Sequence, residues 1–184
     1  RVWHASRLGS AQDSTELRRA RELLPFVQRA THLLDLHSMH EPGAPLLVTG
    51  LLPRNIAFAR ALGTRSQVIA DPGHADGVRM RDYGAFGDPG SDRIALLLEA
   101  GQHWERACLA TARDTLMRFL LAAGSLDRAD VPGGWLQPDA VPPEPVTVTE
   151  RVVARSTDFA FVEDFRGGET IPRAGTLIAH NAGQ

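Results

Sequence analysis

The sequence predicts an α/β fold, in which a mostly parallel or mixed sheet with flanking helices is followed by a small β module. Short apolar runs alternate with segments of helical periodicity as far as residue 126. Five prolines then fall within residues 127–145, as in a stiff linker. From Val146 the pattern changes to alternation with a period of two. We therefore expect an α/β domain over residues 1–126, a linker over 127–145 and a β module over 146–184.

The first half of the domain reads as alternating helices and strands. Asp13 or Ser14 can cap a helix over residues 16–30, and Pro25 within it should kink or break that helix. Short apolar runs then predict strands over residues 31–38, 46–49 and 67–70, and a short helix over residues 54–62 lies between the last two. Strands and helices that alternate in this way are typical of an α/β domain.

The second half of the domain contains a long loop, a strand and a helix. Residues 73–92 hold five glycines and are expected to form a long surface loop. The apolar run over residues 94–98 predicts a strand, and residues 102–123 predict a helix that ends at Gly124. The apolar side of this helix is expected to comprise Leu109, Leu116, Phe119 and Leu120. In the β module, strands are expected over residues 146–149, 151–154, 159–162 and 176–179.

Composition excludes some classes of partner. The 184 residues carry a net charge of -2, so we expect neither nucleic acid nor an anionic membrane surface as a partner. No apolar run approaches the roughly 20 residues that span a bilayer. All 20 basic residues are arginines. A single cysteine, Cys108, excludes a disulfide within the chain and fits a reducing compartment, so a cytoplasmic location is expected.

The candidate chemistry lies at the ends of two predicted strands. His37 follows the apolar residues of the first strand, and Glu99 directly follows the run over residues 94–98. Ligands bind at strand ends in α/β sheets. A zinc hydrolase needs imidazole ligands and a general base, most often a glutamate. Taken singly, His37 also fits a buried structural histidine, and Glu99 fits a residue that caps the next helix.

Three segments resemble the succinylglutamate desuccinylase/aspartoacylase family, whose members are relatives of the zinc carboxypeptidases. Asp35-Leu36-His37-Ser38 resembles the family's DLH[ST] segment, and Leu98 to His103 resembles its strand with the catalytic glutamate. Arg1-Val2-Trp3 resembles the end of a segment whose arginine binds the substrate carboxylate. The resemblance implies a zinc-carboxypeptidase-like mixed sheet and covers nearly the whole chain.

The function that the resemblance implies is zinc-dependent hydrolysis of an N-acyl amino acid amide or a related ester. Zinc would be held partly by His37, Glu99 would be the general base, and Arg1 would hold a carboxylate of this small-molecule substrate. The family takes its other two zinc ligands from an H-x-x-E segment, which this sequence lacks. We therefore expect that segment to precede Arg1, so this chain alone should lack two zinc ligands.

Other residues and another function class stay open. Arg81 and Tyr83, together with Arg79, could clamp an anionic substrate, because arginine binds carboxylates in a bidentate manner. The alternative to an enzyme is a non-catalytic binding or assembly module with an incomplete metal site. Neither the acyl group nor the amino acid follows from the sequence, and a homo-oligomer is possible.

Overall fold

A mixed five-stranded sheet forms the centre of the protein. The computed structural model describes residues 2–73 and 77–181. In the sheet, β1 and β4 are parallel, β4 and β2 are antiparallel, and β2, β3 and β5 run parallel to one another. The strand order is β1-β4-β2-β3-β5, with bounds β1 His32–Met39, β2 Leu46–Thr49, β3 Gln67–Ala70, β4 Ile94–Gln102 and β5 Val146–Thr147. The mixed sheet predicted from the sequence is confirmed.

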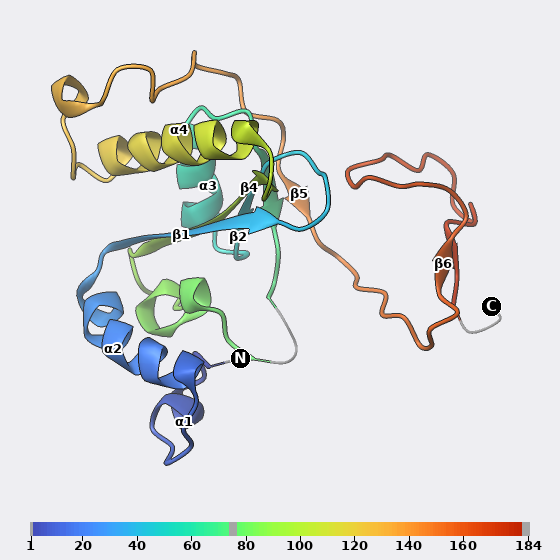
Figure 1. The fold of residues 1–184 in the computed structure, drawn as a ribbon, viewed down its shortest axis with the longest axis horizontal. Helices are drawn as coiled ribbons and strands as arrows, with labels where there is room; N and C mark the ends of the chain where they lie inside the picture. The colour runs from blue at the N-terminus through green and yellow to red at the C-terminus, as the bar shows by residue number, and fades with distance from the viewer. Residues whose placement is uncertain (1, 74–76, 182–184) are drawn as a thin grey trace.

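Helices cover both faces of the sheet (Figure 1). On one face lie α3 (Pro53–Ala61) and α4 (Arg106–Ala122), and the core there includes Leu47, Leu96 and Phe119. On the other face, α2 (Thr15–Arg29) and α1 (Ala5–Leu8) lie beside the short turns of residues 80–86. Side chains at odd positions of β1 and β4 point to this second face, so it also carries the candidate site.

The helix α2 agrees with the expected element, except at its proline. Ser14 caps it, because the Ser14 Oγ accepts a hydrogen bond from the backbone N–H of Leu17 at 3.1 Å. The helix continues through Pro25 to Arg29, so of the expected kink or break the break does not occur. Val27, two residues after the proline, is buried against Leu33 of β1. Tertiary packing of this kind outweighs the local cost of an interior proline.

The described part of the expected surface loop, residues 77–92, contains more regular structure than expected. Two short 3-10 helices, η1 (Met80–Asp82) and η2 (Gly84–Phe86), form within it, and Phe86 is only 1% exposed. Arg54 of α3 donates hydrogen bonds to four backbone carbonyls, those of Phe86, Asp88, Pro89 and Arg93. One guanidinium group therefore fixes the end of the loop that enters β4.

The strand β4 continues past the expected end at Leu98 as far as Gln102, so Glu99 lies inside a strand. His37 of β1 pairs with Glu99, but the next pair is Met39 with Gln102, so β4 carries one extra residue. At this bulge Gly101 adopts a φ of 118°, which glycine tolerates and other residues do not.

We predict that Gly101→Ala destabilises the fold by about 1–3 kcal/mol, because an alanine side chain is strained at this backbone angle. Gly133→Ala is the matched control, since Gly133 has an ordinary φ and open space around it. The free energy of unfolding from urea titrations measures both effects. An equal, small change in the two variants would contradict the role of the bulge.

The helix α4 agrees in part with the expected apolar side, because Phe119 is buried and Leu116 and Leu120 are half-buried. Met117 and Phe119 are buried, whereas Leu109 is 54% exposed. Two charged residues, Asp114 and Arg118, are buried instead. The apolar stripe alone did not predict the burial of Asp114 and Arg118, because these two charged side chains face the proline-rich segment.

The proline-rich segment is attached to the domain. Arg118 Nη2 donates to the carbonyl of Gln137 at 2.7 Å, and Gln67 Nε2 donates to that of Glu144 at 2.6 Å. The guanidinium of Arg113 lies 4.8 Å from the ring centre of Trp135. The short strand β5 then joins the main sheet beside β3, so the chain leaves the domain in a fixed direction.

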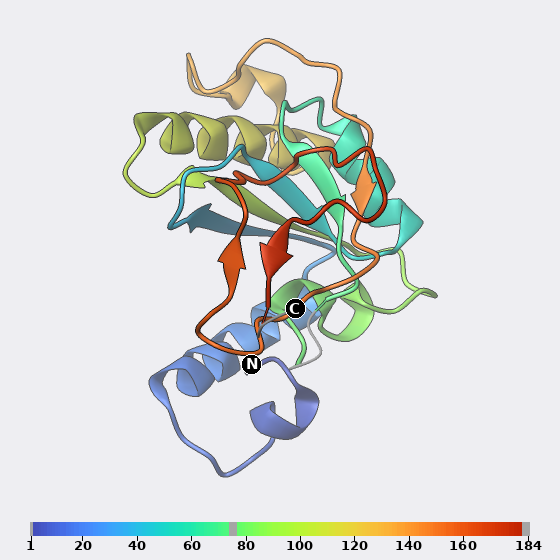
Figure 2. The same cartoon turned by 90° about the vertical axis from the view of Figure 1, so that its right-hand side faces the viewer.

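The rest of the module extends away from the domain (Figures 1 and 2). Its two-stranded antiparallel sheet consists of β6 (Ala160–Phe161) and β7 (Ala179–His180). Of the expected strands, residues 146–149 are represented by β5 and residues 159–162 by β6. Residues 151–154 form no strand, and β7 lies at the end of the fourth expected strand. No helix in the described part of the chain has the length and apolar character needed to cross a membrane.

Candidate active site

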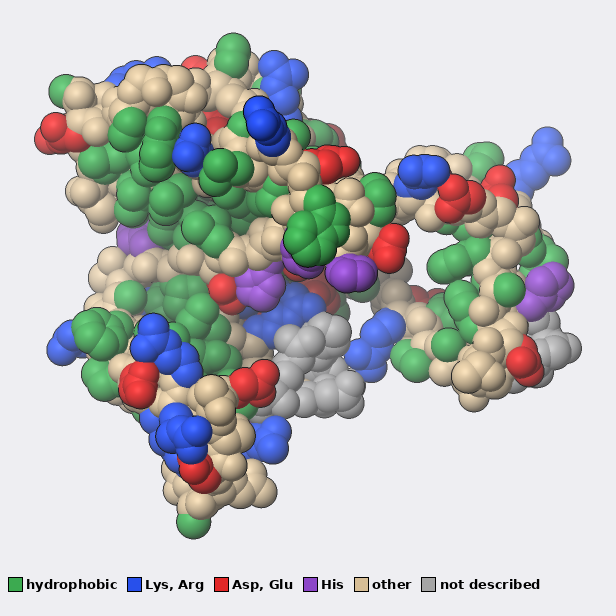
Figure 3. Space-filling view, in the orientation of Figure 1, with side chains coloured by type: hydrophobic (Ala, Val, Ile, Leu, Met, Phe, Trp, Pro, Cys, Tyr) green, Lys and Arg blue, Asp and Glu red, His purple; other side chains and the backbone are tan. Residues whose placement is uncertain are grey.

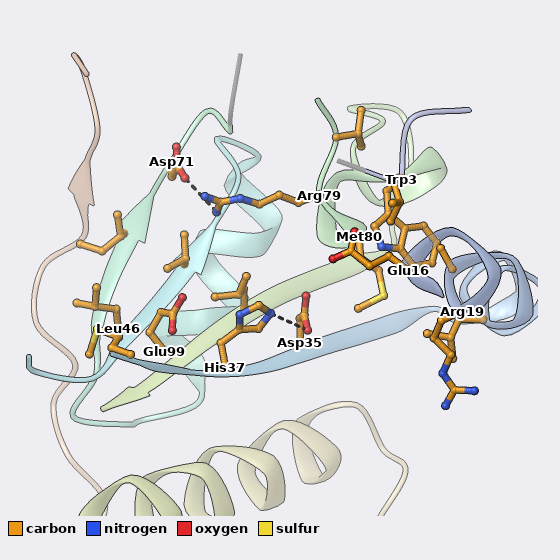
Figure 4. Close-up of a pocket in the computed structure, with 18 of the residues that line it drawn as sticks. Trp3, Glu16, Arg19, Asp35, His37, Leu46, Asp71, Arg79, Met80 and Glu99 are labelled. Atoms are coloured by element: carbon orange, nitrogen blue, oxygen red, sulfur yellow. Dashed lines mark ion pairs between the residues drawn. The ribbon is translucent and has the colours of Figure 1, made fainter. Parts of the chain in front are cut away.

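The sheet pairing brings His37 and Glu99 together. They are direct partners in the parallel pair β1–β4, so their side chains project from the same face of the sheet. Asp35 lies two residues before His37 on that face. Figure 4 shows the three side chains together in the middle of a pocket. The sequence placed these residues at strand ends, and the structure places them in register side by side.

A cavity of about 1110 Å³ surrounds this group. Its walls come from several elements: the sheet face below, α2 and the segment around Trp3 on one side, and residues 78–80 above. In the space-filling view, histidine and acidic side chains gather where the surface is hollowed between the upper and lower layers (Figure 3). The cavity is large enough for a small-molecule substrate.

His37 is oriented by a neighbouring carboxylate. Its Nε2 lies 3.2 Å from Oδ1 of Asp35. A proton on Nε2 that faces Asp35 leaves Nδ1 as the basic nitrogen of the ring. Carboxylates orient histidine ligands in metalloproteins in this manner. Asp35 is therefore the carboxylate placed to orient the ring of His37 within the pocket.

Glu99 is a carboxylate that is held partly out of water. Burial raises its pKa above the ordinary value of 4.5, while the charges of His37 and Arg79 act in the opposite direction. Its Oε2 atom is buried and has no hydrogen-bond partner among the residues that the structure describes. A buried oxygen without a partner is costly in a folded protein and is often part of a functional site. Glu99 has the properties of a group that accepts a proton.

Arg79, Arg81 and Tyr83 occupy different positions from one another. Arg79 lines the cavity, and its Nη1 lies 3.2 Å from Oδ2 of Asp71. The side chain of Arg81 is fully buried behind it and donates to the backbone carbonyl of Asp71 at 3.1 Å. Tyr83 packs against Trp3, with ring centres 5.6 Å apart. Neither Arg81 nor Tyr83 is among the residues that line the cavity, and Arg1 lies outside the described residues.

Asp71 was not proposed from the sequence. It follows β3 directly, and its Oδ1 accepts a hydrogen bond from the backbone N–H of Gly73 at 2.9 Å. The signal was present, because a polar residue at the carboxyl end of a parallel strand is a candidate in any α/β sheet. His103, by contrast, bonds to Ser38 at 2.6 Å and does not line the cavity.

The described residues do not form a complete metal site. Within residues 2–73 and 77–181, no group of three or more histidine, cysteine, aspartate or glutamate side chains is arranged to hold a metal ion. His37 offers one imidazole nitrogen, and the open oxygen of Glu99 lies beside it in register. Zinc usually takes three or four protein ligands, so the described residues do not make up a zinc site by themselves.

Comparison with known proteins identifies the fold. No protein-family model and no curated protein matches the chain. Among solved structures, the chain is similar to the ectoine utilization protein EutE (DoeB) from Ruegeria pomeroyi in its apo form, with a TM-score of 0.58 and 16% sequence identity. The match covers 88% of this chain and 49% of that chain. Its product-bound form matches with a TM-score of 0.56 and 14% identity, over 85% of this chain and 48% of that chain.

A third structure, succinylglutamate desuccinylase from Vibrio cholerae, covers 95% of this chain and 55% of that chain at 19% identity. Its TM-score of 0.49 is too low to support an inference. The chain thus spans about half the length of the solved structures that it matches. The shared fold is a mixed sheet flanked by helices and followed by a small β module, and the fold class predicted from the sequence is confirmed.

Proposed function

We propose that this chain forms part of the active site of a zinc-dependent hydrolase that cleaves an N-acyl amino acid amide or a related ester. The observation that carries the proposal is the register between β1 and β4, which sets His37 beside Glu99 in one cavity. The resemblance of residues 35–38 and 98–103 to desuccinylases and aspartoacylases supports this chemistry, and the fold shared with EutE (DoeB) agrees with the fold that this resemblance implies.

In this proposal His37 supplies one zinc ligand through Nδ1, and Asp35 holds the ring in place. When bound, zinc polarises a carbonyl group and makes water more acidic. The remaining ligands would come from outside the described residues, because these contain no complete set. Arg1, at the edge of the chain, stays a candidate for the group that holds the substrate carboxylate.

Glu99 acts as the general base. Its Oε2 atom takes a proton from the attacking water and later passes it to the leaving amine. Partial burial raises the pKa of Glu99 and so makes its ionised form a stronger base, while His37 and Arg79 keep that form accessible.

We expect His37→Ala to lower the zinc content of the complete protein by about one ion per chain, because a ligand is removed. Inductively coupled plasma mass spectrometry after dialysis measures the metal directly. His103→Ala is the matched control, since His103 lies near the same end of the sheet but does not line the cavity. Unchanged zinc in His37→Ala would remove His37 from the metal site.

A second candidate is a non-catalytic binding or assembly module, which the incomplete ligand set among the described residues favours. The two candidates differ in measurable ways. An enzyme binds zinc and turns over N-acyl amino acids in a manner that depends on Glu99. A binding module holds ligands in the same cavity without turnover, and Glu99→Gln then leaves its properties unchanged.

A further inference from the structure

The sheet face that carries the candidate site changes from polar to apolar across the strands. One row of paired residues runs from His37 through Glu99 to Leu46. The next row runs from Asp35 through Leu97 to Val48 and Ile69. Within the cavity lining, the histidine and carboxylates of these rows lie on β1 and β4, whereas β2 and β3 contribute Leu46, Val48 and Ile69. We call the apolar part of the cavity the apolar floor, which consists of Leu46, Val48, Ile69 and Val148.

The apolar floor begins beside the proposed general base. Leu46 is the direct partner of Glu99 in the antiparallel pair of β2 and β4, so the two side chains are neighbours on one face. At the far side, the backbone N–H of Val148 donates to the carbonyl of Ala70 at 2.9 Å, which holds the segment after β5 against β3. The attached proline-rich segment thus delivers Val148 to the cavity wall.

The charges around the cavity do not favour an anionic group on the acyl part of the substrate, in addition to the carboxylate of its amino acid part. Two arginines line it, and both have carboxylate partners: Arg79 pairs with Asp71 at 3.2 Å, and Arg19 pairs with Glu22 at 2.9 Å. The lining carboxylates, which outnumber these arginines, are Glu16, Asp35, Asp71 and Glu99. A carboxylate placed on the apolar floor would lose its hydration next to Glu99 and would gain no free cation from the described lining residues.

We propose that the apolar floor binds an uncharged aliphatic acyl chain of the substrate, and that the site therefore prefers such chains to dicarboxylic acyl groups such as succinyl. The inference rests on the proposed function, because it assumes that the scissile bond lies near Glu99. An acyl chain whose carbonyl lies beside Glu99 can extend over Leu46 and Val48 toward Ile69. Each methylene that it buries there strengthens binding about threefold to fourfold.

The test compares two ligands of matched shape. In N-isocaproylglycine, two methyl groups take the place of the two terminal carboxylate oxygens of N-succinylglycine. Isothermal titration calorimetry with the complete zinc-loaded protein should give about tenfold tighter binding of the isocaproyl compound, because two methyl groups are buried in place of a carboxylate. Equal or tighter binding of N-succinylglycine, or no saturable binding of either compound, would overturn the inference.

Variants of the apolar floor locate the effect. Val148→Thr should reduce the preference for the isocaproyl ligand about threefold, because a methyl group is replaced by a hydroxyl group. Ile69→Thr should reduce it at least as much, because a hydroxyl group replaces the ethyl branch of the side chain. Val152→Thr is the matched control, since Val152 is 70% exposed and lies outside the cavity. An unchanged preference in both floor variants would contradict the assignment of these residues.

Binding and turnover separate this inference from the proposed function. If N-isocaproylglycine binds with the predicted preference but is not hydrolysed, the proposed hydrolase is wrong and the apolar floor stands. If the protein hydrolyses N-succinylglycine faster and binds it more tightly, the hydrolase stands and the assignment of the apolar floor is wrong.

Discussion

Glu99→Gln is expected to reduce turnover about 10²–10⁴-fold while the fold and the zinc content stay unchanged. Glutamine has nearly the size of glutamate but cannot accept a proton at neutral pH. The Oε2 atom of Glu99 is buried, so no bulk water replaces it as a base at that position. Steady-state kinetics of the complete protein on an N-acyl amino acid, with metal analysis of the same sample, measures both quantities.

Glu16→Gln is the matched control for this loss. Glu16 also lines the cavity, but it lies on the first turn of α2 and is exposed. Its variant should keep turnover within a few-fold of the unmodified protein. Loss of zinc in Glu99→Gln would make Glu99 a metal ligand, and near-normal turnover with zinc retained would exclude it from the chemistry.

Glu99→Gln also has a consequence for the stability of the fold, and this consequence depends on pH. Because burial raises the pKa of Glu99 above 4.5, the folded state holds this proton more tightly than the unfolded state. The free energy of unfolding should therefore fall as pH rises from about 4.5 through the folded pKa, and Glu99→Gln should remove this part of the slope. In the metal-free protein the variant should be the more stable of the two at neutral pH, and the difference should vanish below pH 4.5.

Arg118→Met is expected to reduce the free energy of unfolding by about 3–5 kcal/mol. The guanidinium of Arg118 bonds to Asp114 at 2.9 Å, to the carbonyl of Leu62 at 3.0 Å and to Asp139 at 2.8 Å. It also binds the carbonyl of Gln137. Methionine keeps much of the packing of the stem but leaves the buried carboxylate of Asp114 without its cation. Urea titration, with a check that the slope is unchanged, gives the difference.

Arg60→Met is the control for this second prediction. Arg60 pairs with Glu144 at 2.8 Å, and the Glu144 side chain is 84% exposed. Pairs exposed in this manner contribute about 0–1 kcal/mol, so this variant should be nearly neutral. A similarly small effect of Arg118→Met would mean that the proline-rich segment does not depend on the buried charge network.

The sequence predicted the strands of the sheet well, because short apolar runs bounded by glycine and proline leave few alternatives. The runs around Leu47, Val68 and Leu96 all became central strands. It also selected His37 and Glu99 by their position after apolar runs. It did not predict their pairing, because register depends on which strands become neighbours, and β4 inserts between β1 and β2.

Other features depended on contacts between distant parts of the chain. The burial of Asp114 and Arg118 on α4 was not predicted, because these charged groups bond to each other, to the carbonyl of Leu62 and to residues 137–139. The loop before β4 is ordered by Arg54, which is more than 30 residues away in sequence from its four acceptors. Local patterns carry no record of such partners. The roles of His37 and Glu99 in catalysis stay predictions.

A crystal structure of the complete zinc-loaded protein, with anomalous diffraction measured at the zinc edge, tests the central claim most directly. We expect a zinc ion about 2.0–2.1 Å from a ring nitrogen of His37. We also expect Glu99 Oε2 to face the same space without binding the ion. A zinc ion bound elsewhere, with both ring nitrogens of His37 free of metal, would contradict this assignment.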